Sequence, residues 1–491
     1  MPAPAIADTT CQKYEEVLAA AHTAAPVLAA MPLTERAGLL RAIAGALRAQ
    51  ADSLVPLADA DSSLGVPRLT GEVERTAGQL EMFADAVEEG SWLEAIIDRA
   101  GAGPDLRRML IPLGPVAVFG ASNFPFAFGL AGGDTASALA AGCPVIAKAH
   151  PAQPRLSGAY ARVVIDALRA AGAPEGTFAV VHGMETGRKL VTDARITAVA
   201  FTGSTAGGRA LADLAAARPS PIPFYGELGS LNPVFVTREA ARARGTEIVD
   251  GFLRSMSLGG GQFCTKPGVL FVPAEYGLED LIAAGAATAP MRLLHEGIGA
   301  AFRAEAARLA AHPAVRPLSV PEQDAADESV VRSVLISTTA AEFARCSKQL
   351  LVECFGPFAL VVIYADDAEL AAAADLMEGN LTATVHGERS GDAVAPALLH
   401  ALTRTAGRVI WNGWPTGVTV GWAQHHGGPY PATTSVHTSV GATAMRRFLR
   451  PVAYQSVPDA LLPPPLRDAN ELHIPRRVDG ALTAAPLTAS R

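Results

Sequence analysis

The chain contains few cysteines, and their arrangement excludes two common structural roles. An odd number of cysteines with no Cys-x-x-Cys pair fits neither a disulfide framework nor a structural zinc site. We therefore expect free thiols and a reducing, cytoplasmic setting. The five cysteines among the 491 residues are Cys11, Cys143, Cys264, Cys346 and Cys354.

The sequence also lacks the patterns of nucleic-acid-binding, secreted and membrane-spanning proteins. Its formal net charge is −8 and it contains no basic run, so we expect no nucleic-acid partner. Residues 1–8 lack the charged start and the apolar core of a signal peptide. The most apolar stretch, 115–147, is interrupted by polar residues, prolines and glycines, which predicts buried strands and helices and no membrane contact.

What is present is the composition of a large, well-buried globular protein. Apolar residues make up 49% of the chain and charged residues 18%. The length exceeds what one hydrophobic core usually supports, so two or three domains are expected. The first part of the chain has helical spacing, with a helix predicted to start near Thr34, after Pro32.

From residue 115 onward, short apolar strands alternate with amphipathic helices. This alternation predicts an α/β fold with a parallel sheet covered by helices on both faces. Ligands bind such sheets at the carboxyl ends of the strands, where Asn123, Lys148 and Gly203 would lie. The expected strands are 116–119, 144–148, 178–181 and 198–201, and the expected helices are 131–142, 156–171, 186–192 and one that follows the glycine-rich turn at 203–208 and runs to about 217. A second α/β region is predicted over 229–440, with strands at 233–236, 269–272 and 359–362, and an extended ribbon over 95–113.

Cys264 lies in the glycine-rich run Leu-Gly-Gly-Gly-Gln-Phe-Cys-Thr-Lys-Pro-Gly at 258–268. Glycine permits a backbone that other residues avoid, so a thiol here can approach a ligand closely. Glu227 lies upstream in Tyr-Gly-Glu-Leu-Gly-Ser. A thiol nucleophile with a carboxylate that activates water indicates covalent acyl chemistry. The alternative is a buried structural cysteine in a glycine-rich loop.

Five motifs in order resemble the aldehyde dehydrogenase superfamily. Further motifs at 426–433, 439–441 and 447–452 resemble its branch of 2,5-dioxopentanoate (α-ketoglutaric semialdehyde) dehydrogenases and NADP-dependent fatty aldehyde dehydrogenases. Leu228-Gly229 has the general superfamily form and not the usual form of that branch. The five motifs are Gly-Ala-Ser-Asn-Phe-Pro at 120–125, Phe-Thr-Gly-Ser-Thr at 201–205, Glu-Leu-Gly at 227–229, Gly-Gln-Phe-Cys at 261–264 and Glu-Cys-Phe-Gly-Pro at 353–357.

The resemblance implies an aldehyde dehydrogenase-like fold and a homodimer or homotetramer. Residues 1–93 and 114–228 would form a Rossmann-like cofactor domain, and 229–440 the α/β catalytic domain. Residues 94–113 and 441–475 would form an oligomerisation element, followed by a flexible tail over 476–491.

The resemblance also implies roles for the catalytic residues. Cys264 would be the nucleophile that forms a thiohemiacetal and then a thioester. The Asn123 side chain and the Cys264 backbone N–H would stabilise the oxyanion. Glu227 would activate the water that hydrolyses the thioester.

The cofactor would lie along the ends of the strands. By resemblance, its site residues are Lys148 at the adenosine ribose, Gly203, Ser204 and Gly208 at the pyrophosphate, Leu228, Glu353 at the nicotinamide ribose, Phe355 beside the nicotinamide, and Arg188 near the adenine. Three readings stay open: Lys148 as an ordinary strand-end lysine, Glu353 as a surface acid, and 203–208 as a turn, because it is not the usual Gly-x-Gly-x-x-Gly.

We expect NADP as the preferred cofactor, with NAD as the alternative. NAD-specific members often carry a glutamate three residues after the ribose-binding lysine, and here that position is Pro151. A 2′-phosphate would meet no carboxylate there, and Lys148 and Arg188 would be nearby cations. We expect no metal at His425 and His426, because adjacent strand residues point apart and no matching Cys/Asp cluster is evident.

The expected substrate is a short semialdehyde such as 2,5-dioxopentanoate. Arg108 is a candidate partner for its carboxylate, although the sequence gives no geometric reason to choose it. The alternatives are a fatty or aromatic aldehyde, CoA-dependent acyl transfer, and a non-catalytic binding or structural protein on the same fold. Glu227 favours water over CoA as the acyl acceptor.

Overall fold

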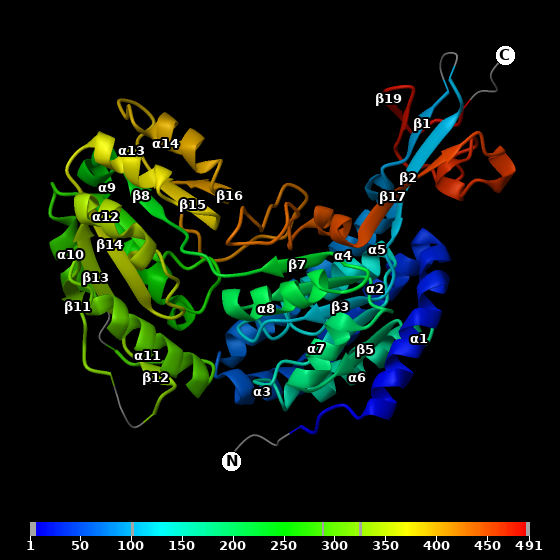
Figure 1. The fold of residues 1–491 in the computed structure, drawn as a ribbon, viewed down its shortest axis with the longest axis horizontal. Helices are drawn as coiled ribbons and strands as arrows, with labels where there is room; N and C mark the ends of the chain where they lie inside the picture. Colours follow the sequence, from blue (N-terminus) through cyan, green and yellow to red (C-terminus); the bar gives the residue numbers. More distant parts are fainter. Residues whose placement is uncertain (1–5, 100–102, 287–288, 324–326, 488–491) are drawn as a thin grey trace.

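The computed structural model describes residues 6–99, 103–286, 289–323 and 327–487. Figure 1 shows two α/β bodies side by side and a ribbon-like sheet that projects from one end. Within the described ranges, no helix is both long and apolar enough to cross a membrane.

The first body is built on a five-stranded sheet in the order β5-β4-β3-β6-β7. All of its strand pairs are parallel, as the alternating pattern predicts. Side chains of β3 alternate between the two faces: Val116 and Val118 join one core, and Ala117 and Phe119 join the other. The strands are β3 (Val116–Phe119), β4 (Val145–Lys148), β5 (Phe178–Val181), β6 (Ala198–Thr202) and β7 (Phe224–Glu227).

Helices cover both faces of this sheet (Figure 1). The helix predicted after Pro32 begins at Leu33, and its apolar positions Leu39, Leu40, Ile43 and Leu47 are buried. The helices are α1 (Cys11–Ala30), α2 (Leu33–Ala49), α3 (Ala51–Ser62), α4 (Val66–Glu89), α5 (Gly133–Ala141), α6 (Leu156–Ala170), α7 (Met184–Thr192) and α8 (Thr205–Ala216).

The second body contains a seven-stranded sheet in the order β11-β13-β14-β9-β8-β15-β16. Only β11 runs antiparallel to its neighbour. Its strands are β8 (Val234–Val236), β9 (Val269–Pro273), β11 (Arg316–Ser319), β13 (Val334–Thr339), β14 (Phe358–Tyr364), β15 (Asn380–His386) and β16 (Ala406–Trp411). The helices around it are α9 (Arg238–Ser257), α10 (Leu278–Gly285), α11 (Glu296–Ala310), α12 (Ala340–Leu350), α13 (Asp367–Asp375) and α14 (Ala395–Leu402), and β10 (Met291–Arg292) pairs with β12 (Val330–Val331) beside them.

The projecting sheet has the order β17-β2-β1-β18-β19. It confirms the ribbon predicted over 95–113 and adds the C-terminal segment to it. Its strands are β1 (Ile96–Asp98), β2 (Leu106–Pro112), β17 (Leu449–Gln455), β18 (Arg476–Val478) and β19 (Ala481–Thr483).

The prediction of a flexible tail from residue 476 is wrong for its first part. β18 pairs in parallel with β1, and β19 pairs with β18. Arg476 is fully buried, and its guanidinium donates to the backbone carbonyls of Arg467, Asp468 and Ala485. Buried charges are rare unless they are hydrogen-bonded in this way. The end of the predicted tail, 488–491, lies outside the described residues.

Candidate active site

Three consecutive glycines shape the turn that carries Cys264. Gly259, Gly260 and Gly261 have φ values of +58°, +67° and +69°, which side chains other than glycine rarely adopt. A Cβ on Gly261 would lie 2.3 Å from the backbone of Gly356. The turn therefore packs directly against the segment that carries Glu353, and Cys264 follows it half-buried.

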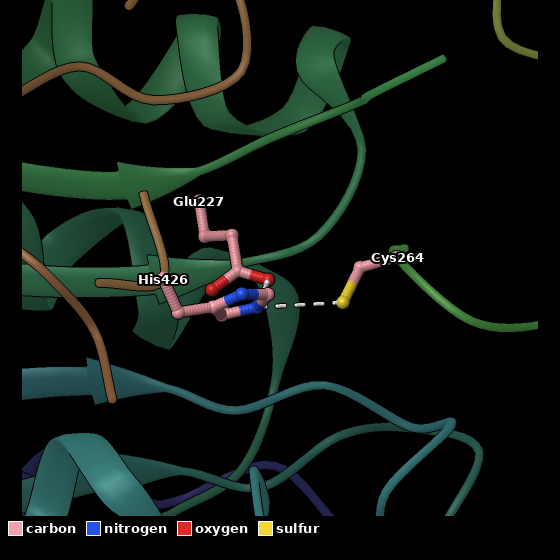
Figure 2. Close-up of side chains that lie close together, drawn as sticks. All are labelled: Glu227, Cys264 and His426. Carbon is pink, nitrogen blue, oxygen red and sulfur yellow. Dashed lines mark hydrogen bonds and ion pairs between the residues drawn. The ribbon is translucent and has the colours of Figure 1, made fainter. Parts of the chain in front are cut away.

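Cys264 faces a histidine that is also bound to Glu227 (Figure 2). The Cys264 Sγ lies 3.5 Å from His426 Nε2, and the same nitrogen lies 3.0 Å from Glu227 Oε1. The other Glu227 oxygen accepts a hydrogen bond of 2.7 Å from the Ser439 hydroxyl. Thiol, imidazole and carboxylate thus lie in one cluster. Because Nε2 carries either a proton or a lone pair, it donates to Glu227 in one tautomer and can accept from the thiol in the other, and in the second tautomer it is an adjacent base that can activate the nucleophile.

This cluster corrects the analysis of the histidine pair. We expected no cysteine or acidic cluster to accompany His425 and His426, yet potential ligand atoms of Glu227, Cys264 and His426 lie within 4.8 Å of one another. The segment 412–441, which carries His426, runs between the two bodies in an irregular path (Figure 1). No helix or strand periodicity there could have placed its histidine against residues 227 and 264.

The protonation of the cluster follows from its burial and charges. Burial raises the pKa of the Cys264 thiol well above its ordinary 9.0, and the charge of Glu227 raises it further. Burial also acts to raise the pKa of Glu227, but the neighbouring His426 and hydrogen bonds from His426, Ser439 and Cys264 outweigh it, and the net shift is downward. The resting site therefore holds a thiol and a carboxylate.

Asn123 lies beside the nucleophile turn, as predicted for the end of β3. Its side-chain amide donates to the Gln262 carbonyl over 2.9 Å. The backbone of Cys264 is fixed from the other side, because the Asn232 side chain donates to the Cys264 carbonyl over 2.8 Å. Two amides therefore hold the turn in place, and Asn232 is a positioning residue that the sequence analysis missed.

The residues predicted for the pyrophosphate and nicotinamide ends gather at the start of α8. The Ser204 hydroxyl caps that helix by accepting from the Gly207 N–H, and a Cβ on Gly208 would lie 2.2 Å from Leu228. Gly229 donates its N–H to the Thr205 hydroxyl over 3.1 Å, and a Cβ on Gly229 would lie 2.5 Å from Glu353 Oε2. The structure thus brings Ser204, Leu228 and Glu353 to one place.

Glu353 is less freely ionised than an ordinary carboxylate. Burial raises its pKa to about 7, opposed by a hydrogen bond from the Ser230 N–H and by the charge of Lys266. Phe355 lies two residues further on and is partly exposed. Residues 353–355 therefore suit a ligand whose hydroxyl groups donate to the Glu353 carboxylate and whose aromatic ring packs against Phe355.

The helix start and these glycines fit a dinucleotide. The first turn of α8 directs free N–H groups outward, and the glycines at 203, 207 and 208 let Phe201, Ser204 and Leu228 pack closely around this helix start. Lys148 is buried at the end of β4, where burial lowers its pKa and the charge of Asp8 acts in the opposite direction. Its Nζ contacts the Met184 sulfur at 3.7 Å.

Two arginines considered in the sequence analysis, Arg188 and Arg108, are not part of the cluster in Figure 2. Arg188 is largely exposed on α7, with its charged head 3.9 Å from Glu185. Arg108 lies on β2 of the projecting sheet, 3.8 Å from Glu94. Arg188 stays a prediction for the adenine end, whereas the position of Arg108 argues against contact with a substrate at Cys264 (Figure 1).

Comparisons with known proteins agree with this architecture. The profile described as "Aldehyde dehydrogenase family" matches residues 3–292. The chain is 44% identical over 464 residues to alpha-ketoglutaric semialdehyde dehydrogenase 2 of Azospirillum brasilense, which covers 92% of this chain and 88% of that protein. It is 40% identical over 471 residues to alpha-ketoglutaric semialdehyde dehydrogenase of Acinetobacter baylyi, covering 91% of this chain and 87% of that protein. Among solved structures, PnpE in complex with nicotinamide adenine dinucleotide is similar in fold, with a TM-score of 0.76 and 22% identity, over 92% of this chain and 91% of that one.

Proposed function

Since the chain belongs to the aldehyde dehydrogenase family, we propose that its substrate is 2,5-dioxopentanoate, which it oxidises to 2-oxoglutarate with NADP preferred over NAD. The observation that carries the chemistry is the contact of His426 Nε2 with both Cys264 Sγ and Glu227 Oε1. The two α-ketoglutaric semialdehyde dehydrogenases above support the choice of substrate.

The first half of the reaction follows from the resting protonation state. Cys264 holds its proton until a base removes it, and His426 Nε2, 3.5 Å away, can accept that proton in the tautomer that carries the ring proton on Nδ1. The imidazolium formed would be stabilised by Glu227 at 3.0 Å. The thiolate then adds to the aldehyde carbon. Asn123, once its amide leaves the Gln262 carbonyl, and the Cys264 N–H would donate to the resulting oxyanion.

The dinucleotide would be held by Lys148, the N-terminus of α8 with Ser204, and Glu353. When bound, its nicotinamide supplies the hydride acceptor that turns the thiohemiacetal on Cys264 into a thioester. Glu227 then takes a proton from the attacking water, and the ionised state favoured by its lowered pKa suits this task. Hydrolysis releases the acid and restores the thiol.

The runner-up substrate is a fatty or aromatic aldehyde, and CoA acylation is the competing second half-reaction. A cofactor-reduction assay with purified protein, an aldehyde panel and CoA separates them, because CoA should produce no thioester and should leave the rate unchanged. Cys264→Ala should abolish oxidation while the dinucleotide still binds, and Cys346→Ala, a matched cysteine on α12, should leave activity intact. More than a few per cent of activity in the Cys264 variant would refute the nucleophile, and no oxidation of any aldehyde by the unmodified protein would favour a non-catalytic role.

We further propose a cytoplasmic homodimer or homotetramer. All five cysteines are free, which suits a reducing setting. The projecting sheet of β17, β2, β1, β18 and β19 is the element that would carry assembly, and the mass in solution by light scattering tests this.

A further inference from the structure

Helix α4 directs two arginines toward the active site. Arg68 and Arg75 are seven positions apart and therefore lie on one face of the helix, about two turns from each other. Arg68 stacks on the rings of Phe124 and Phe263, at 4.9 and 5.0 Å from the ring centroids. Arg75 stacks on Phe128 at 5.4 Å. These rings belong to the two segments that carry Asn123 and Cys264.

Arg68 lies against the nucleophile turn itself. Its Nη2 donates to the Asn123 carbonyl over 2.8 Å. Its Nη1 is buried without a hydrogen-bond partner, and a Cβ on Gly259 would lie 2.9 Å from that nitrogen. Because Gly259 has no side chain, this guanidinium can pack against the turn that precedes Cys264.

Arg75 approaches the cluster from the side of His426. Its Nη2 donates to the Val418 carbonyl over 3.3 Å, and its Nη1 is likewise buried without a partner. The Phe128 ring beneath it lies 6.2 Å from the His426 ring. Burial lowers the pKa of Arg75, and the charges of Glu72 and Glu227, and that of Cys264 when it is a thiolate, act in the opposite direction. The charges of the reacting groups therefore act on this guanidinium.

The acid between the two arginines acts on both through its charge but forms a direct ion pair with neither. Glu72 uses one carboxylate oxygen to accept the N–H groups of Phe126 and Ala127, at 2.8 and 2.9 Å. Its other oxygen is buried without a partner. Among the described residues, neither Arg68 nor Arg75 has an ion-pair partner within 4.0 Å. Other arginines among the described residues also leave a buried guanidinium nitrogen without a partner, but there it is Nε; only Arg68 and Arg75 leave a terminal Nη1 free to donate to a ligand.

We infer that Arg68 and Arg75 bind the carboxylate of the aldehyde substrate and set the preference for a semialdehyde over a neutral aldehyde. A guanidinium binds a carboxylate through strong, charge-assisted hydrogen bonds, whereas a neutral chain would leave both Nη1 atoms unpaired. This inference rests on the proposed aldehyde oxidation and names the ligands of its substrate.

The test compares two aldehydes of equal length that differ in charge. Values of kcat/KM and KM are measured with 2,5-dioxopentanoate and with pentanal for the unmodified protein, R68Q, R75Q and the double variant. The matched control is R404Q, whose arginine forms an exposed ion pair with Asp375. The double variant should lose about tenfold to a hundredfold in kcat/KM with the semialdehyde, mostly through KM, and should lose much less with pentanal. R68K with R75K should recover part of the loss, because the charge returns without the planar fork.

Three outcomes would overturn the inference. The first is a semialdehyde preference that R68Q and R75Q leave unchanged. The second is an equal loss with both aldehydes, which would assign the arginines to the structure of the turn. The third is an equal kcat/KM of the unmodified protein for pentanal and for the semialdehyde. That result would keep the aldehyde dehydrogenase function but contradict the preference for a semialdehyde. Absence of all oxidation would instead refute the proposed function itself.

Discussion

His426 occupies a position from which one ring nitrogen serves two partners. Nε2 lies within reach of both Cys264 Sγ and Glu227 Oε1, so in the Nδ1–H tautomer it can accept the thiol proton and then donate a hydrogen bond to the carboxylate, which stabilises the resulting charge. Ser439 fixes the carboxylate from the other side. The same carboxylate must later act on water, so the three side chains serve both halves of the reaction at different moments.

Two substitutions separate these halves. Glu227→Gln keeps the shape of the side chain but cannot take a proton from water, so a pre-steady-state burst of reduced cofactor should precede a steady state slowed by about 10²- to 10⁴-fold. His426→Gln should diminish the burst itself, because the thiol loses a base that lies 3.5 Å away. Rapid-mixing absorbance measurements check both. Complete loss of the burst in Glu227→Gln would show that Glu227 itself, and not His426, takes the proton from the thiol.

The pH dependence of the thiol follows from the sign of its shift. The thiolate of Cys264 is opposed first by burial and then by the negative charge of Glu227, so its pKa lies above 9.0 and alkylation should accelerate as the pH rises through the alkaline range. Removing the anion favours the thiolate. In Glu227→Gln the pH profile of the iodoacetamide rate should therefore move to lower pH. Glu353→Gln should move it less, because the charge of Glu353 acts less strongly on the thiol than that of Glu227. An unchanged profile in Glu227→Gln would contradict this electrostatic account.

At the scale of elements, the strands and helices of the first body were predictable because their pattern is local. The predicted strand over 178–181 coincides with β5, and the helix predicted over 156–171 with α6. Alternating burial on a parallel sheet and amphipathic helix faces leave a signature within each short segment. The positions at the strand ends, Asn123, Lys148 and Gly203, follow directly from that topology.

The residues that the sequence did not indicate act across long separations. His426 belongs to an irregular segment, and Arg68 and Arg75 read as charged residues of an amphipathic helix whose polar face would ordinarily meet solvent. Only the packing of α4 against the segment 123–128 shows that this part of the face is half-buried. The strands at 476–483 were missed because they are short and their partner, β1, is distant in the sequence.

The N-terminal segment adds a carboxylate that bears on the choice of cofactor. Position 151 offers none, but a Cβ on Gly183 would lie 2.5 Å from the Asp8 carboxyl carbon, and the Asp8 charge acts on both Lys148 and His182. NADP should still be used at least as well as NAD. Asp8→Asn should raise the ratio of kcat/KM for NADP over NAD by roughly threefold to tenfold, because one exposed negative charge is removed from the approach of a 2′-phosphate. Glu15→Gln, which removes an exposed acid from α1, is the control.

Steady-state kinetics with NAD and NADP tests both the cofactor preference and the effect of Asp8. A kcat/KM for NAD that is tenfold above that for NADP would refute the NADP preference. If Asp8→Asn and Glu15→Gln shift the ratio equally, the effect belongs to net charge and not to the position of Asp8.

At the scale of the whole molecule, the site depends on segments that only the complete fold brings together. The carboxylate comes from β7, the thiol from the turn before β9, and the histidine from the segment after β16 (Figures 1 and 2). The sequence motifs identified the first two because each has a local signature. The third required the path of the chain between the two bodies.

The projecting sheet gives the last prediction, since two strands near the C-terminus close it. Ending the chain after residue 475 would remove β18 and β19, expose the edge of β1, and delete the fully buried Arg476, which leaves the carbonyls of Arg467 and Asp468 without their donor. Buried acceptors that lose their donor destabilise a protein by about 1–3 kcal/mol each, so the midpoint of thermal unfolding should fall by several degrees or more. Ending the chain after Leu487 should leave it unchanged, because every strand and the Leu487 N–H bond to Asp468 remain. Calorimetry on both truncations checks this, and equal midpoints would mean that residues 476–487 behave as the flexible tail that the sequence alone suggests.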